Sequence, residues 1–185
     1  MGQELSRDLP ITAYALLGLL SFGDALTGYE LKQRADRTLR FYWVSPAMSQ
    51  VYSELDRLHE RGLVRAQGGE RTTSYSLTRR GRSVLTRWLR ETPVGFPVLK
   101  HPVALRLLLG ALVEPATVTG MLKDHLAELE GERQALEQVR ISLEGQDGPG
   151  DAFRYPALVA DWGRSYFEHE RLIVEDLLRR IDEGT

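Results

Sequence analysis

Apolar residues recur along the chain with spacings that predict helices first and a strand pair later. Residues 11–22 are almost wholly apolar but only twelve residues long, which suits a buried helix. A second, short helix is expected after Thr27, a plausible N-cap. A third helix over 46–61 turns one apolar stripe to the core, made of Met48, Val51, Leu55 and Leu58.

The third helix has the most distinct ends. Ser45 can cap its first turn, Pro46 suits the first helical position, and Gly62 can adopt the left-handed conformation that ends a helix. Its outward face carries small polar residues where a solvated helix usually carries charge. The residues on this face are Ser49, Gln50, Ser53 and Arg57. Such a face indicates a surface that touches a partner.

A hairpin is predicted next, because the segments LVRAQ and TSYSLT alternate apolar and polar residues around GGER. Gly68 and Gly69 should form the turn. The residues expected on one side of the hairpin are Val64, Ala66, Tyr75 and Leu77.

A fourth helix over 79–91 follows, with Thr78 as its cap. Its apolar stripe is Val84, Leu85, Trp88 and Leu89. Three helices, a hairpin wing and a fourth helix within residues 1–92 are the order of a winged helix-turn-helix. We therefore expect a mainly α fold with this domain at its N-terminus.

Two prolines and a glycine in TPVGFP indicate a domain boundary, so residues 93–185 form a second, helical domain. Residues 103–113 are apolar nearly all round and should be buried. Residues 116–143 and 154–182 predict two long helices. The first carries a leucine heptad (Leu122, Leu129, Leu136, Leu143), and the second a stripe of Trp162, Tyr166, Ile173, Leu177 and Ile181. The two helices predict a homodimer, although the heptad could instead pack within one subunit.

Charge is distributed unevenly along the chain. Residues 1–92 hold 14 Lys and Arg against 10 Asp and Glu, whereas residues 93–185 hold 10 against 16. Nine arginines and only two acidic residues lie within 57–90. A local basic patch on an otherwise acidic chain indicates a polyanion as the partner.

The outward face of the third helix suits the DNA major groove. Gln can bond adenine, Arg can bond guanine, and Ser can contact bases or phosphates. Tyr52 could pack against the core or reach a phosphate, and both readings stay open. Phosphates are expected to meet the arginines of the hairpin and fourth helix, namely Arg65, Arg71, Arg79, Arg80 and Arg82.

Three blocks of sequence together resemble the PadR family of bacterial transcriptional regulators. They are LLGLLSFGDALTGYELKQR, SQVYSELDRLHERGLV and SYSLTRRGRSVLTRWL. The resemblance covers about residues 11–92 and implies a dimeric winged-helix protein, usually a repressor released by a small molecule. The remainder is similar in architecture to the larger C-terminal dimerisation domain of that family, which is likened to virulence activators. The expected DNA contacts are Ser45, Ser49, Gln50, Tyr52, Ser53, Arg57, Arg71 and Thr72.

The resemblance and the number of aromatic residues also raise the possibility of an effector pocket for an aromatic small molecule. Its candidate residues are Trp88, His101, Trp162 and Tyr166. Ordinary core packing explains the same residues and is the favoured reading for any single one of them. The four histidines are scattered, without the close pairing of a zinc site on one helix, so no metal and no cofactor are expected.

Other classes of function have less support. The chain has no cysteine, no apolar run long enough to span a membrane and no catalytic motif, so we expect a cytoplasmic protein that is not an enzyme. A winged-helix module that binds another protein is the main alternative. Steep salt dependence of binding would favour DNA over an apolar protein interface. The leading hypothesis is a homodimer that binds double-stranded DNA at an inverted-repeat operator.

Overall fold

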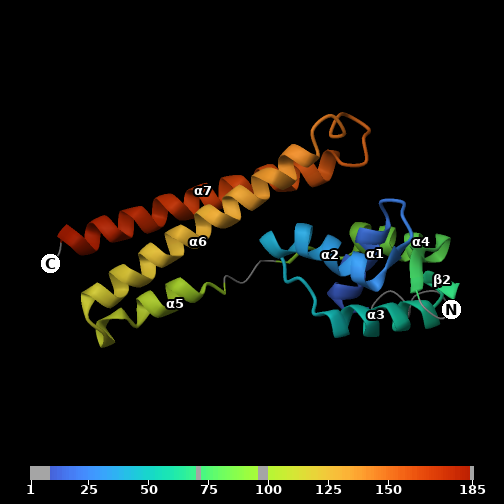
Figure 1. The fold of residues 1–185 in the computed structure, drawn as a ribbon, viewed down its shortest axis with the longest axis horizontal. Helices are drawn as coiled ribbons and strands as arrows, with labels where there is room; N and C mark the ends of the chain where they lie inside the picture. The colour runs from blue at the N-terminus through green and yellow to red at the C-terminus, as the bar shows by residue number, and fades with distance from the viewer. Residues whose placement is uncertain (1–8, 70–71, 96–99, 184–185) are drawn as a thin grey trace. The chain divides into compact units, whose positions relative to one another are not determined.

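The computed structural model describes residues 9–69, 72–95 and 100–183. The chain divides into two compact units, Met1–Gly95 and Phe96–Thr185. Figure 1 shows the first as a cluster of short helices with a small sheet, and the second as long helices. None of the described helices is long and apolar enough to cross a membrane.

The N-terminal unit has the predicted order of elements, with two short additions, a strand and a 3-10 turn. Its elements are α1 (Ile11–Leu20), β1 (Leu26–Thr27), α2 (Gly28–Thr38), the 3-10 turn η1 (Leu39–Phe41), α3 (Met48–Glu60), β2 (Val64–Gly69), β3 (Thr72–Leu77) and α4 (Arg79–Glu91). The short strand β1 was not predicted. The order and the sheet confirm the winged helix-turn-helix.

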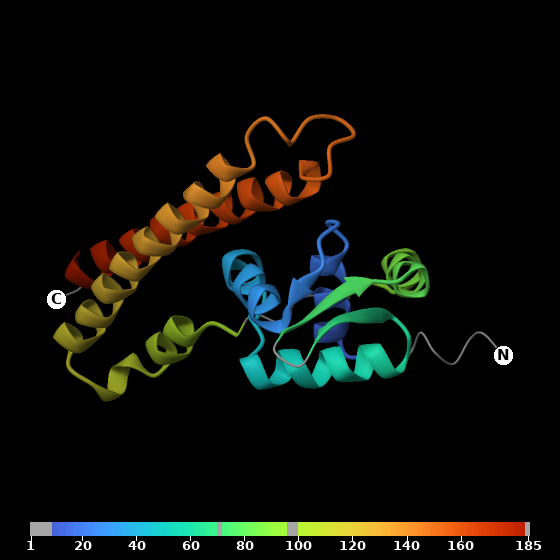
Figure 2. The ribbon, with the colours of Figure 1, turned by 45° about the vertical axis from the view of Figure 1, so that its right-hand side comes forward.

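The sheet is antiparallel with strand order β1-β3-β2, and its hairpin lies beside α3 (Figure 2). Val64 pairs with Leu77, and Ala66 pairs with Tyr75. Because paired residues of an antiparallel ladder point to the same face, the predicted side of the hairpin is confirmed. The predicted turn at Gly68 and Gly69 is wrong, because both residues belong to β2 and pair with Thr73 and Thr72. The tip of the hairpin, residues 70–71, lies outside the described residues.

One continuous apolar core holds the N-terminal unit together. Val51, Leu55 and Leu58 of α3 are fully buried in it, as predicted, beside leucines of α1 and Leu31 of α2. The stripe of α4 is only partly confirmed. Val84 and Leu85 are buried, whereas Leu89 is 67% exposed.

The caps of α2 and α4 are confirmed. Thr27 Oγ1 accepts from the Glu30 amide at 3.2 Å, and the Glu30 carboxylate accepts from the Thr27 amide at 2.8 Å, which makes a capping box. These hydrogen bonds lower the pKa of Glu30. Thr78 Oγ1 accepts from the Gly81 amide at 3.0 Å and starts α4.

The prediction for the start of α3 is wrong by two residues. The helix runs from Met48 to Glu60 rather than over 46–61, and Ala47 is its N-cap residue, without a side-chain cap hydrogen bond. Ser45 does not cap it, because its hydroxyl donates to Asp36 of α2 at 2.6 Å. The end is as predicted, since Gly62 has φ of +68°.

The C-terminal unit consists of α5 (Pro102–Leu108), the 3-10 turn η2 (Gly110–Leu112), α6 (Pro115–Ser142) and α7 (Arg154–Glu183). The two long helices pack along each other, and α5 lies against α6. The heptad residues Leu122, Leu129 and Leu136 are buried within the single chain. The heptad therefore packs between α6 and α7 of one subunit, which was the alternative to pairing between subunits.

Two burial predictions for this unit are wrong. Leu105, Leu108 and Leu112 are 61–81% exposed, because α5 is seven residues long and turns only one side, with Val103 and Leu107, to the core. On α7 the buried positions at its start are small, namely Ala157, Ala160 and Gly163. The predicted stripe instead leaves Trp162, Tyr166 and Ile173 exposed, and only Leu177 and Ile181 pack on the core.

Candidate nucleic-acid interface

The outward face of α3 is the centre of the candidate site. Ser49, Gln50 and Ser53 are all exposed, and the amphipathic pattern of the helix fixes their direction because its opposite stripe is fully buried. The Ser53 hydroxyl donates to the carbonyl of Gln50 at 3.1 Å. The Gln50 amide makes no hydrogen bond within the described part of the chain, so both its donor and its acceptor face solvent.

Arg57, one turn further along α3, is oriented by a carboxylate. Its Nη1 lies 3.3 Å from Oε1 of Glu54. The Glu54 side chain is buried, and its second oxygen, Oε2, has no hydrogen-bond partner among the described residues. A buried carboxylate that is only half satisfied is costly. The burial of Glu54 also removes its charge from the outward face, where it would repel phosphates.

Tyr52 packs on the neighbouring helix. A Cβ atom placed on Gly28, the first residue of α2, would lie 2.5 Å from Cε1 of the Tyr52 ring. Only glycine therefore lets α2 approach the ring this closely. The ring still leaves 44% of the residue exposed, so packing and contact with a partner are compatible. Gly28 therefore lets the second helix pack closely against the third.

A polar network fixes the segment that leads into α3. Lys32 and Ser45 both donate to Oδ1 of Asp36. The hydrogen bonds from Lys32 and then Ser45 lower the pKa of Asp36, so the carboxylate stays ionised. The network joins α2 to the turn before α3. Ser45 and Lys32 are therefore half-buried structural groups in this structure rather than free side chains.

The basic residues around α3 are open to solvent. Arg65 on β2 and Arg79, Arg80 and Arg82 on α4 are exposed, and none forms an ion pair with another described residue. Thr72, at the start of β3, is also exposed. Arg71 lies outside the described residues. Exposed guanidinium groups without intramolecular partners are suited to phosphate contacts.

The four candidate effector residues divide between the two units. Trp88 lies in the N-terminal unit, where its ring stacks on Tyr14 with centroids 4.6 Å apart. Trp162 and Tyr166 stack on the surface of α7 with centroids 6.1 Å apart. His101 caps α5 by accepting from the Ala104 amide at 3.2 Å. Partial burial and then the charge of Glu170 raise the pKa of Tyr166.

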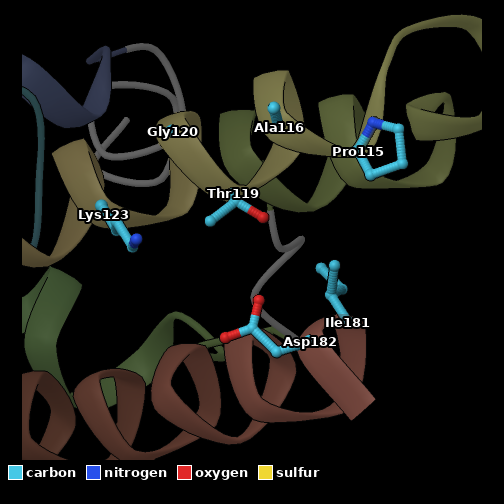
Figure 3. A pocket seen from close by; sticks show the side chains of 7 residues that line it. All are labelled: Pro115, Ala116, Thr119, Gly120, Lys123, Ile181 and Asp182. Carbon is cyan, nitrogen blue, oxygen red and sulfur yellow. The ribbon is translucent and has the colours of Figure 1, made fainter. Parts of the chain in front are cut away.

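A groove in the C-terminal unit does not include any of these four residues. It has a volume of about 450 Å³ and lies between the start of α6 and the end of α7, with Thr119 and Asp182 facing each other across it (Figure 3). Its lining residues are Pro115, Ala116, Thr119, Gly120, Lys123, Ile181 and Asp182. The groove is open and partly polar, so an enclosed aromatic-binding cavity is not found there.

A cluster that the sequence did not suggest brings two of the scattered histidines together. His101 precedes α5, His125 lies on α6, and both approach Glu170 of α7. The Nε2 atoms lie 2.9 Å and 3.3 Å from the same oxygen, Oε1 of Glu170. No spacing motif could reveal it, because the three residues are 24 and 45 positions apart on different elements.

The comparisons with known proteins agree with this architecture. Residues 16–87 match the model of the transcriptional regulator PadR-like family. That segment runs from α1 through the candidate interface to α4. Among curated protein sequences, none matches the chain.

Solved structures are similar over nearly the whole chain. A PadR-like transcriptional regulator of Bacillus cereus has a TM-score of 0.79 and 19% identity, covering 94% of this chain and 99% of its own. Bacillus subtilis PadR in complex with operator DNA has a TM-score of 0.78 and 21% identity, covering 93% of this chain and 99% of its own. The same protein in complex with p-coumaric acid has a TM-score of 0.76 and 22% identity, covering 94% of this chain and 99% of its own.

The virulence activator AphA of Vibrio cholerae gives a TM-score of 0.72 and 20% identity, covering 94% of this chain and 99% of its own. At these identities the likenesses establish a shared fold that includes the C-terminal helices. The family match covers the winged helix-turn-helix itself. The N-terminal unit therefore matches the PadR-like family model, and the whole chain shares the fold of the solved PadR-like regulators.

Proposed function

We propose that this chain is a PadR-like regulator, namely a homodimeric, sequence-specific DNA-binding repressor that binds an inverted-repeat operator and is released by an aromatic small molecule. The observation that carries the proposal is the outward face of α3, where Ser49, Gln50 and Ser53 are exposed and no acidic residue lies between them. Bacillus subtilis PadR, which shares the fold, has been solved with operator DNA.

In this proposal α3 enters the major groove. Gln50 and Arg57 read base edges, Ser49 and Ser53 contact bases or phosphates, and the ring of Tyr52 braces α3 against α2 while its hydroxyl reaches a phosphate. Ser45 acts indirectly, through its hydrogen bond to Asp36, which fixes the entry into α3. The phosphates beside the groove are held by the wing and by α4, through Arg65, Arg71, Thr72, Arg79, Arg80 and Arg82.

The dimer is assigned to the exposed apolar face of α7. Each half of an inverted repeat needs one copy of α3, so two chains must associate. The face that α6 leaves uncovered carries Tyr155, Leu158, Trp162 and Ile173, each at least 54% exposed. A contiguous apolar stripe along a 30-residue helix is a large exposed patch for a lone chain. Packing against α7 of a second copy of the chain would cover this face, and the second copy would also supply the second α3.

Sedimentation equilibrium tests the dimer. The wild-type chain should sediment as twice 20.9 kDa, and Trp162→Glu should shift the equilibrium towards single chains because it places a charge in an apolar interface. Ser165→Glu, on the same helix, is the control for added charge alone. A Trp162→Glu protein that stays as dimeric as the control would remove α7 from the interface.

Operator binding is tested with duplexes selected from a random pool. The selected duplexes should contain an inverted repeat and bind two chains, and an aromatic acid such as p-coumaric acid should lower their affinity. Binding of single half-sites with equal affinity would contradict the two-fold mode of reading. A steep loss of affinity with salt distinguishes DNA binding from the alternative, a protein-interaction module.

The effector site is proposed at the aromatic residues of the C-terminal unit, Trp162 and Tyr166, with His101; Trp88 is a separate candidate in the N-terminal unit. Trp88, Trp162 and Trp43 are the three tryptophans of the chain, so tryptophan fluorescence reports on two of the candidate residues. Quenching by phenolic acids that is lost in Trp162→Phe and Tyr166→Ala would support the site. Unchanged fluorescence across a panel of such compounds would count against it.

A further inference from the structure

The cluster of His101, His125 and Glu170 lies wholly within the C-terminal unit and joins three of its elements. His101 stands at the N-cap position of α5, His125 one-third of the way along α6, and Glu170 near the middle of α7. The two imidazole rings meet edge to face with centroids 5.5 Å apart. Each residue offers one ligand atom, and all three atoms lie within 4.8 Å of one another.

The charge of Glu170 has no permanent counterion. Its side chain is 14% exposed, and its only ion-pair partners in the described part of the chain are the two histidines, which are 15% and 16% exposed. No Lys or Arg lies within ion-pair distance of this carboxylate among the described residues. A mostly buried carboxylate beside two imidazole nitrogens, without a Lys or Arg partner, is an environment that favours a bound cation.

The spacing of the ligand atoms fits a metal ion. With Zn–N and Zn–O distances of about 2.0–2.2 Å, neighbouring ligand atoms in a tetrahedral site are separated by about 3.3–3.5 Å. The observed separations of 2.9 Å and 3.3 Å between Glu170 Oε1 and the two Nε2 atoms are already close to this range. Imidazole and carboxylate ligands without thiolates suit Zn²⁺, Ni²⁺, Co²⁺ and similar ions.

We propose that His101, His125 and Glu170 bind one divalent transition-metal ion of the Zn²⁺ class, which ties the start of α5 to α6 and α7. Three protein ligands leave at least one position for water or a further ligand. The proposed metal site does not depend on DNA binding, so its test is independent of the test of the proposed function.

Metal binding has one structural consequence that a simple hydrogen-bonded triad lacks. In the structure, Nδ1 of His101 accepts from the Ala104 amide, so the proton of the neutral ring is on Nε2, facing Glu170. Coordination through Nε2 moves this proton to Nδ1. The cap hydrogen bond of Ala104 must then break. The Ala104 amide should exchange with solvent faster when the metal is bound.

The test uses the full chain, freed of any affinity tag and treated with a chelator. Isothermal titration with Zn²⁺ should give one ion per chain, and Co²⁺ should give the visible absorption of a low-symmetry site. His125→Asn and Glu170→Gln should each weaken Zn²⁺ binding by at least the roughly 10–100-fold that loss of an outer-shell partner causes. Zn²⁺ should raise the unfolding temperature of the wild type but not of these two variants.

Two further variants keep the result interpretable. His101→Asn removes the imidazole but keeps a strong N-cap side chain, so α5 is retained while the metal is lost. His169→Asn is the matched control, because His169 is adjacent to Glu170 but its ring faces the Ser165 carbonyl at 2.7 Å. Binding that is absent in the wild type, or equal in His101→Asn and His169→Asn, would overturn the proposal and leave a hydrogen-bonded triad only.

Discussion

Replacing Gly28 by alanine perturbs the contact between α2 and α3 at a single point. The added Cβ would lie 2.5 Å from Cε1 and 2.8 Å from Cζ of the Tyr52 ring. Separations below 3.0 Å do not occur for real Cβ atoms, so the ring or α3 must move. The backbone of Gly28 is itself helical, so alanine introduces no strain of its own there.

The size of the effect follows from two opposing contributions. Overpacking of this kind costs about 1–3 kcal/mol, and the lower end applies because the Tyr52 ring can swing towards solvent. Alanine in place of glycine gains roughly 0.5–1 kcal/mol in a helix. Gly18→Ala in α1 is the matched control, since nothing lies within 4 Å of its added Cβ and only the gain remains.

Urea unfolding and operator affinity together measure the outcome. Gly28→Ala should be about 1 kcal/mol less stable than Gly18→Ala, the lower end of the overpacking range. It should also bind operator more weakly, because Tyr52 or α3 is displaced. Adding Tyr52→Ser should restore stability by removing the clash, a coupling that a double-mutant cycle detects. If Gly28→Ala were as stable as Gly18→Ala and bound operator normally, the packing assigned to Tyr52 would be wrong.

Three more predictions concern the caps, the ion pairs and the phosphates. Thr78→Ala should lower the unfolding free energy by about 1–2 kcal/mol, since the Gly81 amide loses its acceptor; Thr78→Ser should not. Hydrogen bonds from Arg133 lower the pKa of Glu130 to about 2. The ionised carboxylate therefore contributes to the free energy of unfolding above pH 4.5, and this contribution is lost as the pH falls towards 2. The unfolding free energy of Glu130→Gln, measured across the same acid titration, should lack this pH-dependent loss. Arg79→Ala should reduce the slope of log affinity against log salt by about 0.9 for specific and random duplexes alike, and an unchanged slope would exclude a phosphate contact.

Local signals were enough for most of the N-terminal unit. The alternation that pairs Val64 with Leu77 and the cap at Thr78 depend on residues close in sequence, and both predictions are confirmed. The predicted start of α3 was wrong because it depends on a residue distant in sequence. Ser45 is captured by Asp36, nine residues earlier on another helix, and no local pattern announces that hydrogen bond.

Burial in the C-terminal unit was harder to predict because large apolar residues were assumed to face the core. On α7 the close approach to α6 is made by Ala157, Ala160 and Gly163, while Trp162 faces outward. Small residues at helical spacing were the missed signal. The exposed apolar face of α7 is the surface proposed for the dimer, and a rule based on hydrophobicity alone cannot distinguish such a surface from a face that packs on the core.

The metal cluster and the buried Glu54 show a second limit. His101, His125 and Glu170 meet only because α5, α6 and α7 pack together, so their proximity follows from tertiary structure. Glu54 is charged, yet it is buried beside Arg57, which no local pattern of the sequence indicates. Its burial leaves the outward face more basic than the sequence suggests.

The most direct test of the account is whether Gln50 discriminates between DNA sequences. Fluorescence anisotropy should compare the duplex upstream of the protein's own gene, or a selected operator, with a scrambled duplex across a salt series. The wild type should bind the operator far more tightly than the scrambled duplex, and Gln50→Ala should lose about 1–3 kcal/mol of that difference while binding random DNA as before. Equal loss on both duplexes would contradict the assignment of α3 as the helix that reads bases.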